Sequence, residues 1–311
     1  MKLFLYSLMM IAGTIHECSS QLEKLTYLDL SNNKLQGIIP ASYRTFKNLN
    51  EMLLGLNELN GSLPTSFGQL SNLVILELTG NCLTGILSEE HFLFWMLVPP
   101  RSPSPFQISY LNMTSCNLGP SFSTWLKFQK EVNTLALSNA SISGSIPNWF
   151  WNISSQLRFL SLSFNQLQGH LPNQLSRISL TFIDFSSNLF EGSILLPNLG
   201  CLILDLSKNK FFGSIPTKIG ESMSNLKFLL LSNNQITGII LESIGYMSSL
   251  EILDLSRNSL TRSMPLSISN CSYLIFQSLE ENNLFRTIPK SFGQLIWLRS
   301  LHLSKIDHFF T

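Results

Sequence analysis

The chain has 311 residues, of which 13% are charged, and a formal net charge of +1. This near-neutral balance gives no reason to expect a nucleic acid or an anionic membrane surface as the partner. The length fits one or two globular domains or one elongated repeat array, so the choice depends on periodicity.

The first residues, 1–20, have the pattern of a secretory signal peptide. Lys2 precedes the apolar run LFLYSLMMIAG, and small residues follow it. The alternative is a buried remnant of a repeat. No later apolar run approaches the roughly 18 residues of a spanning helix. We therefore expect contact with a membrane only through a transmembrane helix that this chain lacks.

The rest of the chain repeats the pattern LxxLxLxxNxLxGxIP, as in LTYLDLSNNKLQGIIP (25–40) and LEILDLSRNSLTRSMP (250–265). We call its Asn the ladder position. It is occupied in turn by Asn33, Asn57, Asn81, Cys116, Ala140, Asn165, Asn188, Asn209, Asn234, Asn258, Asn282 and, in a partial last unit, Ile306. Most steps are 23 to 25 residues, which predicts repeat blocks over 21–87 and 108–305 and a truncated tail over 306–311.

Each part of this pattern has a structural role. The LxL alternation predicts a short strand with its leucines turned inward. The Asn amide is expected to bond backbone groups of adjacent coils. The Gly allows a tight bend and the Pro stiffens the chain that leaves it. The fold class predicted is an α/β repeat solenoid of about 11 repeats with a parallel sheet on its concave face.

The irregular, Pro-rich stretch 88–107 interrupts the repeats, because the step from Asn81 to Cys116 is 35 residues. Its prolines predict an extended excursion out of the solenoid. We interpret it as the scar of a lost repeat, with a ligand-binding island as the alternative. The missing Asn at the two following ladder positions predicts that the solenoid is softest here.

This pattern resembles the plant-type leucine-rich repeat, a horseshoe-shaped solenoid. The segment SYLNMTSCNLGP, with Cys116 at the ladder position, is more narrowly similar to the ectodomains of plant receptor-like proteins, the kinase-less defence receptors. The resemblance implies an extracellular or plasma-membrane location and signalling through a co-receptor kinase. Members of that family carry terminal caps and an anchor that we do not recognise here, so we interpret the chain as truncated.

Five cysteines are scattered without CxxC pairs, which indicates neither a metal site nor a dense disulfide framework. Five sequons would be glycosylated in the secretory pathway. Their asparagines are Asn60, Asn112, Asn139, Asn152 and Asn270. Motifs of hydrolases, kinases, phosphate loops and zinc proteases are not found, so we expect no enzyme, no cofactor and no metal.

The candidate site is the solvent face of the predicted sheet, formed by positions six, four and two before each ladder position. These columns hold seven acidic residues and no Lys or Arg: Asp29, Glu51, Glu77, Asp184, Asp205, Asp254 and Glu280. The residues predicted to bind ligand are Phe159, Phe182, Asp184, Asp205, Phe228, Asp254 and Phe276. Scaffold roles for the aspartates, and packing between coils for the phenylalanines, remain alternatives.

These features favour a non-catalytic extracellular recognition module for a peptide or protein of apolar and basic character, as in plant defence receptors. Two alternatives remain open. One is a secreted inhibitor of a microbial cell-wall-degrading enzyme, similar to polygalacturonase inhibitors. The other is a non-functional fragment.

Overall fold

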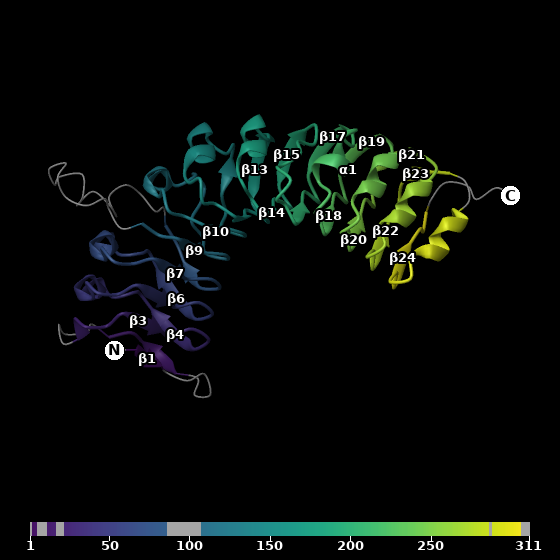
Figure 1. The fold of residues 1–311 in the computed structure, drawn as a ribbon. Coiled ribbons are helices and arrows are strands. Elements are labelled where there is room, and N and C mark those ends of the chain that lie inside the picture. The colour runs from purple at the N-terminus through teal and green to yellow at the C-terminus, as the bar shows by residue number, and fades with distance from the viewer. Residues whose placement is uncertain (1, 5–10, 17–21, 86–106, 286–287, 306–311) are drawn as a thin grey trace. The chain divides into compact units, whose positions relative to one another are not determined.

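The computed structural model describes residues 2–4, 11–16, 22–85, 107–285 and 288–305. The chain divides into two compact units, Met1–Leu157 (unit 1) and Arg158–Thr311 (unit 2). Both are stacks of coils, each coil running from one ladder position to the next, and both contain parallel sheets (Figure 1). The predicted fold class, a leucine-rich repeat solenoid with a parallel sheet, is confirmed.

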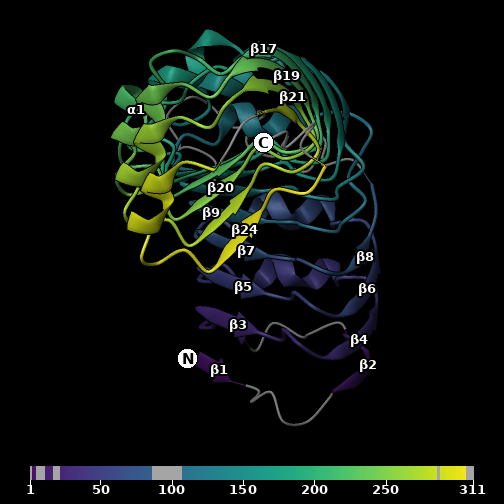
Figure 2. The ribbon, with the colours of Figure 1, turned by 90° about the vertical axis from the view of Figure 1, so that its right-hand side faces the viewer.

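In unit 1 one strand per coil forms the main sheet. In order these strands are β1 (Lys2–Phe4), β3 (Tyr27–Asp29), β5 (Glu51–Leu53), β7 (Ile75–Glu77), β9 (Tyr110–Asn112) and β10 (Thr134–Ala136). At the opposite end of the coils lie β2 (Ala12–Thr14), β4 (Lys34–Gly37), β6 (Glu58–Gly61) and β8 (Cys82–Leu83), and a further strand, β11, spans Ser143–Gly144 (Figure 2). The 3-10 helices are η2 (Ala41–Thr45), η3 (Thr65–Gln69), η6 (Thr124–Phe128) and η7 (Asn148–Asn152).

Unit 2 repeats the arrangement. Its main sheet has the order β12 (Phe159–Ser161), β14 (Phe182–Asp184), β16 (Ile203–Asp205), β18 (Phe228–Leu230), β20 (Ile252–Asp254), β22 (Phe276–Ser278) and β24 (Ser300–His302). A second sheet holds β13 (Gln166–His170), β15 (Leu189–Gly192), β17 (Lys210–Ser214), β19 (Gln235–Ile239), β21 (Ser259–Arg262) and β23 (Asn283–Leu284). The helices are η8 (Asn173–Arg177), α1 (Ile219–Ser222), η9 (Glu242–Tyr246), η10 (Leu266–Asn270) and η11 (Lys290–Gln294).

The ladder asparagines join the coils as predicted. The Asn188 amide Nδ2 donates to the Phe185 and Ser186 carbonyls of its own coil at 3.2 and 3.1 Å, and to the Leu162 carbonyl of the preceding coil at 2.9 Å. Its Oδ1 accepts from the Leu167 N–H at 3.0 Å. One buried side chain therefore satisfies four backbone groups and fixes the register of two coils.

Where the ladder Asn is missing, fewer side-chain hydrogen bonds join the coils. The Cys116 Sγ donates to the Leu78 carbonyl at 3.3 Å, and Ala140 has no side-chain donor or acceptor. Burial raises the pKa of the Cys116 thiol to about 12, so it stays a neutral thiol. That this region is the softest of the solenoid stays a prediction.

The interruption does not break the main sheet of unit 1. Strands β7 and β9 pair directly, with Ile75 opposite Tyr110 and Leu76 opposite Leu111. Gln107 also holds the next coil, because its Nε2 donates to the Phe128 carbonyl at 3.0 Å and its Oε1 accepts from the Lys130 N–H at 2.6 Å. Strands β7 and β9 are therefore neighbours in the main sheet. Residues 88–106 of the predicted excursion lie outside the described residues.

The bend predicted for LxGxIP is also present. Gly192 has φ +94°, and a Cβ there would lie 2.3 Å from Cδ2 of His170 in the preceding coil. Six prolines then occupy the position before a 3-10 helix: Pro40, Pro64, Pro147, Pro172, Pro265 and Pro289. Their fixed φ prepares the turn into the helix, where the missing N–H costs no hydrogen bond.

One core position departs from the leucine pattern. Gln277 occupies the centre of β22, where neighbouring strands place Leu253 and Leu301. Its side chain is 0% exposed, and neither amide atom has a hydrogen-bond partner among the described residues. A buried amide without partners lowers stability by about 1–3 kcal/mol.

We therefore expect Gln277→Leu to raise the free energy of unfolding by about 1–3 kcal/mol, measured by urea denaturation. The matched control is Gln235→Leu, because Gln235 is exposed at the start of β19. This substitution should change the free energy of unfolding little. Equal effects of the two substitutions, or destabilisation by Gln277→Leu, would contradict the account.

Candidate functional site

The main sheet of unit 2 carries one continuous column of apolar side chains, six residues before each ladder position. We call it the apolar column: Phe159, Phe182, Ile203, Phe228, Ile252 and Phe276. Its members are directly opposite one another on consecutive strands from β12 to β22. All are half-buried, so each offers part of its surface to solvent.

The phenylalanines of this column pack between coils and also remain accessible. The rings of Phe159 and Phe182 are stacked, with centroids 4.1 Å apart and an interplanar angle of 8°. The Phe276 ring lies 5.3 Å from that of His302 on β24. The ring contacts agree with the alternative that these phenylalanines pack between coils. The part of each ring that remains accessible contributes to an apolar stripe along the sheet.

Beside the apolar column, four residues before the ladder, stand Asp184, Asp205 and Asp254. Each uses Oδ1 to accept the N–H of the serine two residues later, at 3.0, 2.9 and 3.0 Å respectively. In Asp184 and Asp254 the same oxygen also accepts the serine hydroxyl at 2.7 Å. These aspartates thus have the scaffold role that was the alternative for them.

The aspartates also create a negative strip beside the apolar column. Asp184 and Asp205 are directly opposite on β14 and β16. Burial raises the pKa of Asp205, the Ser207 hydrogen bonds oppose that rise, and the nearby Asp184 and Asp254 carboxylates add to it. A cation placed beside these groups would relieve the repulsion between them.

The positions two before the ladder differ from expectation. Ser163, Ser186, Ser207, Ser232 and Ser256 are buried, whereas we had expected this column to face solvent. The short serine side chains turn toward the carboxylates, as the Ser186 and Ser256 hydroxyls show. In unit 2 the predicted solvent face therefore loses these five serines, whereas Glu280 at the same offset is half-buried.

The sequence analysis missed a second column, of exposed and half-buried residues, at the position just before the ladder. In unit 2 it is Phe164, Ser187, Lys208, Asn233, Arg257, Glu281 and Lys305, all with positive φ between 52° and 55°. Glu281 pairs with Lys305 at 3.1 Å and with Arg257 at 3.5 Å. These residues share a fixed offset from the ladder, which was the only signal in the sequence. Their residue types vary too much to indicate a positive φ.

Unit 1 offers no such apolar column. The corresponding residues are Tyr27, Glu51, Ile75, Tyr110 and Thr134, all half-buried. The tyrosine hydroxyls bond acidic neighbours, Tyr110 to Glu77 at 2.9 Å and Tyr27 to Asp29 at 3.3 Å. The apolar stripe is thus a property of unit 2.

The sequon asparagines differ in accessibility. Asn60, Asn139, Asn152 and Asn270 are exposed, whereas Asn112 is half-buried on β9 and its Oδ1 accepts from the Thr114 N–H at 3.1 Å. Glycosylation at all five stays a prediction.

Within the part of the chain that the structure describes, no three His, Cys, Asp or Glu side chains lie close enough to hold a metal ion. None of the helices found there has the length and apolar character needed to cross a membrane.

The raised pKa of Asp205 predicts a pH-dependent gain in stability for Asp205→Asn. Because the folded state binds the Asp205 proton more tightly than the unfolded state, this group lowers stability as pH rises through its pKa range. Asparagine keeps the Oδ1 acceptor for Ser207 and has no charge. The variant should exceed the wild type in free energy of unfolding at pH 7, with the difference shrinking toward pH 3. A difference that does not change with pH would contradict this.

Comparison with known proteins agrees with the geometry. Leucine rich repeat family models match residues 23–83, 203–260 and 156–178. Receptor-like protein EIX2 of Solanum lycopersicum is 37% identical over 135 residues, covering 43% of this chain and 13% of that protein. This chain thus spans a small part of that relative's length.

Solved structures extend the similarity to most of the chain. The crystal structure of a TDR receptor matches with a TM-score of 0.81 and 29% identity, over 94% of this chain and 49% of that one. The plant peptide hormone receptor RGFR1 in complex with RGF2 matches with a TM-score of 0.78 and 25% identity, over the same shares. The chain has the fold of the leucine-rich repeat proteins, and the curated relatives it resembles are plant receptor-like proteins.

Proposed function

We propose that unit 2 is a non-catalytic extracellular recognition module that binds a peptide or protein segment along the apolar column. The observation that carries the proposal is the register of six half-buried apolar side chains on consecutive strands, with a negative strip beside them. Rigid aromatic side chains that are already ordered are good anchors for a partner, because little side-chain entropy is lost on binding.

The chemistry of the face defines the ligand class. Apolar side chains of the ligand would cover the phenylalanines, and a Lys or Arg would approach Asp184, Asp205 and Asp254. At each aspartate Oδ1 is occupied by the following serine N–H, and at Asp184 Oδ2 also accepts from the Ser161 hydroxyl at 3.1 Å. Ligand cations would therefore be held mainly through Oδ2 of Asp205 and Asp254. The ligand is therefore an extended segment of apolar and basic character.

The wider role is a proposal of the same kind. The chain would act at the cell surface in defence signalling, with a co-receptor kinase supplying the intracellular step. Supporting it are the similarity to plant receptor-like proteins and the solved similarity to a peptide hormone receptor in complex with its ligand. The exposed sequons Asn60, Asn139, Asn152 and Asn270 fit a secreted surface.

The test uses a phage library of random peptides selected on the immobilised wild-type chain. Selected peptides should be enriched in apolar and basic residues. Their binding to Phe182→Ser/Phe228→Ser should be weaker by at least about tenfold, the loss expected when one anchor is removed. The matched control is Tyr246→Ser/Leu266→Ser, which removes exposed apolar side chains on η9 and η10 and should bind as the wild type does.

Thermal unfolding accompanies the binding measurement. Loss of the Phe159–Phe182 stack should cost about 0.5–1.5 kcal/mol in addition to the apolar area that the rings bury, and the melting curve shows whether the variant remains folded. If no peptide is enriched, or if selected peptides bind the Phe182→Ser/Phe228→Ser variant as well as the wild type, the proposal is wrong.

A further inference from the structure

Residues 11–16 of unit 1 follow the repeat pattern in phase with the coils after them. Gly13, Gly37 and Gly61 are each 24 residues apart. On the same spacing, Ile11 corresponds to Leu35 and Ile15 to Ile39, the inward positions of LxGxI. The apolar run interpreted as part of a signal peptide thus ends in the second half of a leucine-rich repeat.

The backbone of this stretch also bonds as a coil. Strand β2 pairs in parallel with β4, Ala12 opposite Lys34 and Gly13 opposite Leu35. The Ile11 N–H donates to Asn33 Oδ1 at 2.9 Å, as the Leu35 N–H does to Asn57 Oδ1 at 3.0 Å one coil later. The bond between Ile11 and Asn33 is thus equivalent to the ladder bond one coil later.

Side-chain packing repeats in the same way. A Cβ on Gly37 would lie 3.2 Å from Thr14 Cγ2, and one on Gly61 would lie 2.8 Å from Ile38 Cγ2. Thr14 is 24 residues before Ile38, so the two side chains occupy equivalent places in successive coils. The Ile11–Asn33 hydrogen bond and the place of Thr14 beside Gly37 thus give the same phase.

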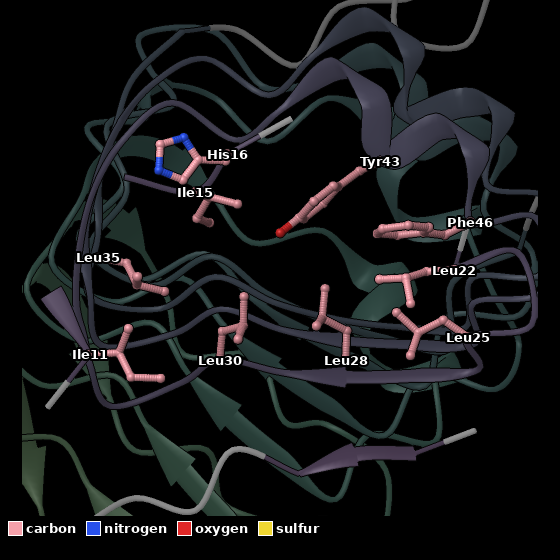
Figure 3. Close-up of a pocket in the computed structure, with 10 residues that line it drawn as sticks. All are labelled: Ile11, Ile15, His16, Leu22, Leu25, Leu28, Leu30, Leu35, Tyr43 and Phe46. Atoms are coloured by element: carbon pink, nitrogen blue, oxygen red, sulfur yellow. The ribbon is translucent and has the colours of Figure 1, made fainter. Parts of the chain in front are cut away.

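This coil covers the beginning of the core. Ile11, Ile15 and His16 face Leu28, Leu35 and Tyr43 around an apolar cavity of about 260 Å³. Figure 3 shows this cavity in close-up. The core side chains behind them are almost fully buried, with Leu25 2%, Tyr43 2% and Phe46 1% exposed.

We infer that residues 11–16 are a structural part of the solenoid. They pack against the apolar core side chains of Leu25, Leu28, Leu35, Tyr43 and Phe46. The same residues cannot both be removed with a signal peptide ending at residue 20 and cover this core. The inference concerns unit 1 and does not rest on the function proposed for unit 2.

The test compares variants of the full chain, expressed without secretion. Ile11→Ser/Ile15→Ser should lower the midpoint of thermal unfolding by at least about 4 °C and increase the fluorescence of a dye that binds apolar surface. The control is Ala12→Ser, because Ala12 is exposed on the same coil and its side chain is not among the contacts described above. Its midpoint and dye binding should equal those of the wild type.

A graded variant covers the case in which the double serine variant does not fold. Ile11→Val/Ile15→Val should then fold with a midpoint between those of the wild type and the serine variant. N-terminal sequencing of the chain secreted from plant cells should find residues 11–16 present. Equal midpoints for the serine variant and its control would overturn the inference, and so would a secreted chain that lacks these residues and melts like the full chain.

Discussion

The structure depends on the hydrogen bonds of a repeated buried amide. A coil of about 24 residues has too little apolar surface to fold alone, so it is stable only against its neighbours. The ladder asparagines make that stacking specific, because Asn209 bonds the Phe185 carbonyl of one coil, accepts from the Phe190 N–H, and closes its own turn at Leu206 and Ser207. The leucines supply most of the stabilisation, and the asparagines determine which residues lie opposite one another.

The candidate site follows from that register. Side chains at a fixed offset from the ladder lie directly opposite on successive strands, so a preference for Phe and Ile at one offset becomes a continuous stripe. The same offset in unit 1 carries tyrosines that bond Asp29 and Glu77, and no stripe forms. Whether an apolar stripe forms thus depends on the residue types at one offset, because the backbone hardly varies from coil to coil.

Sequence reasoning reached the fold and the columns because both depend on spacing, which LxxLxLxxN states directly. It was wrong about the serine column of unit 2, where Ser186 and Ser256 are buried and their hydroxyls bond the neighbouring aspartates. It missed the positive φ before each ladder position, where Leu, Phe, Lys, Arg and Glu all occur. It also passed over Gln277, which stands at the second Leu of LxxLxLxxN counted from Asn282 and is therefore a core position.

The central claim is that the ladder holds the coils in the register that forms the apolar column. Hydrogen exchange of Asn209→Ala, followed by mass spectrometry, tests it most directly. The substitution removes four hydrogen bonds of about 1 kcal/mol each. Amides of β14, β16 and the turn at Leu206 should exchange faster, with those of β20 and β22 less affected. Unchanged protection around β16, or equal loss along the whole of unit 2, would contradict the account.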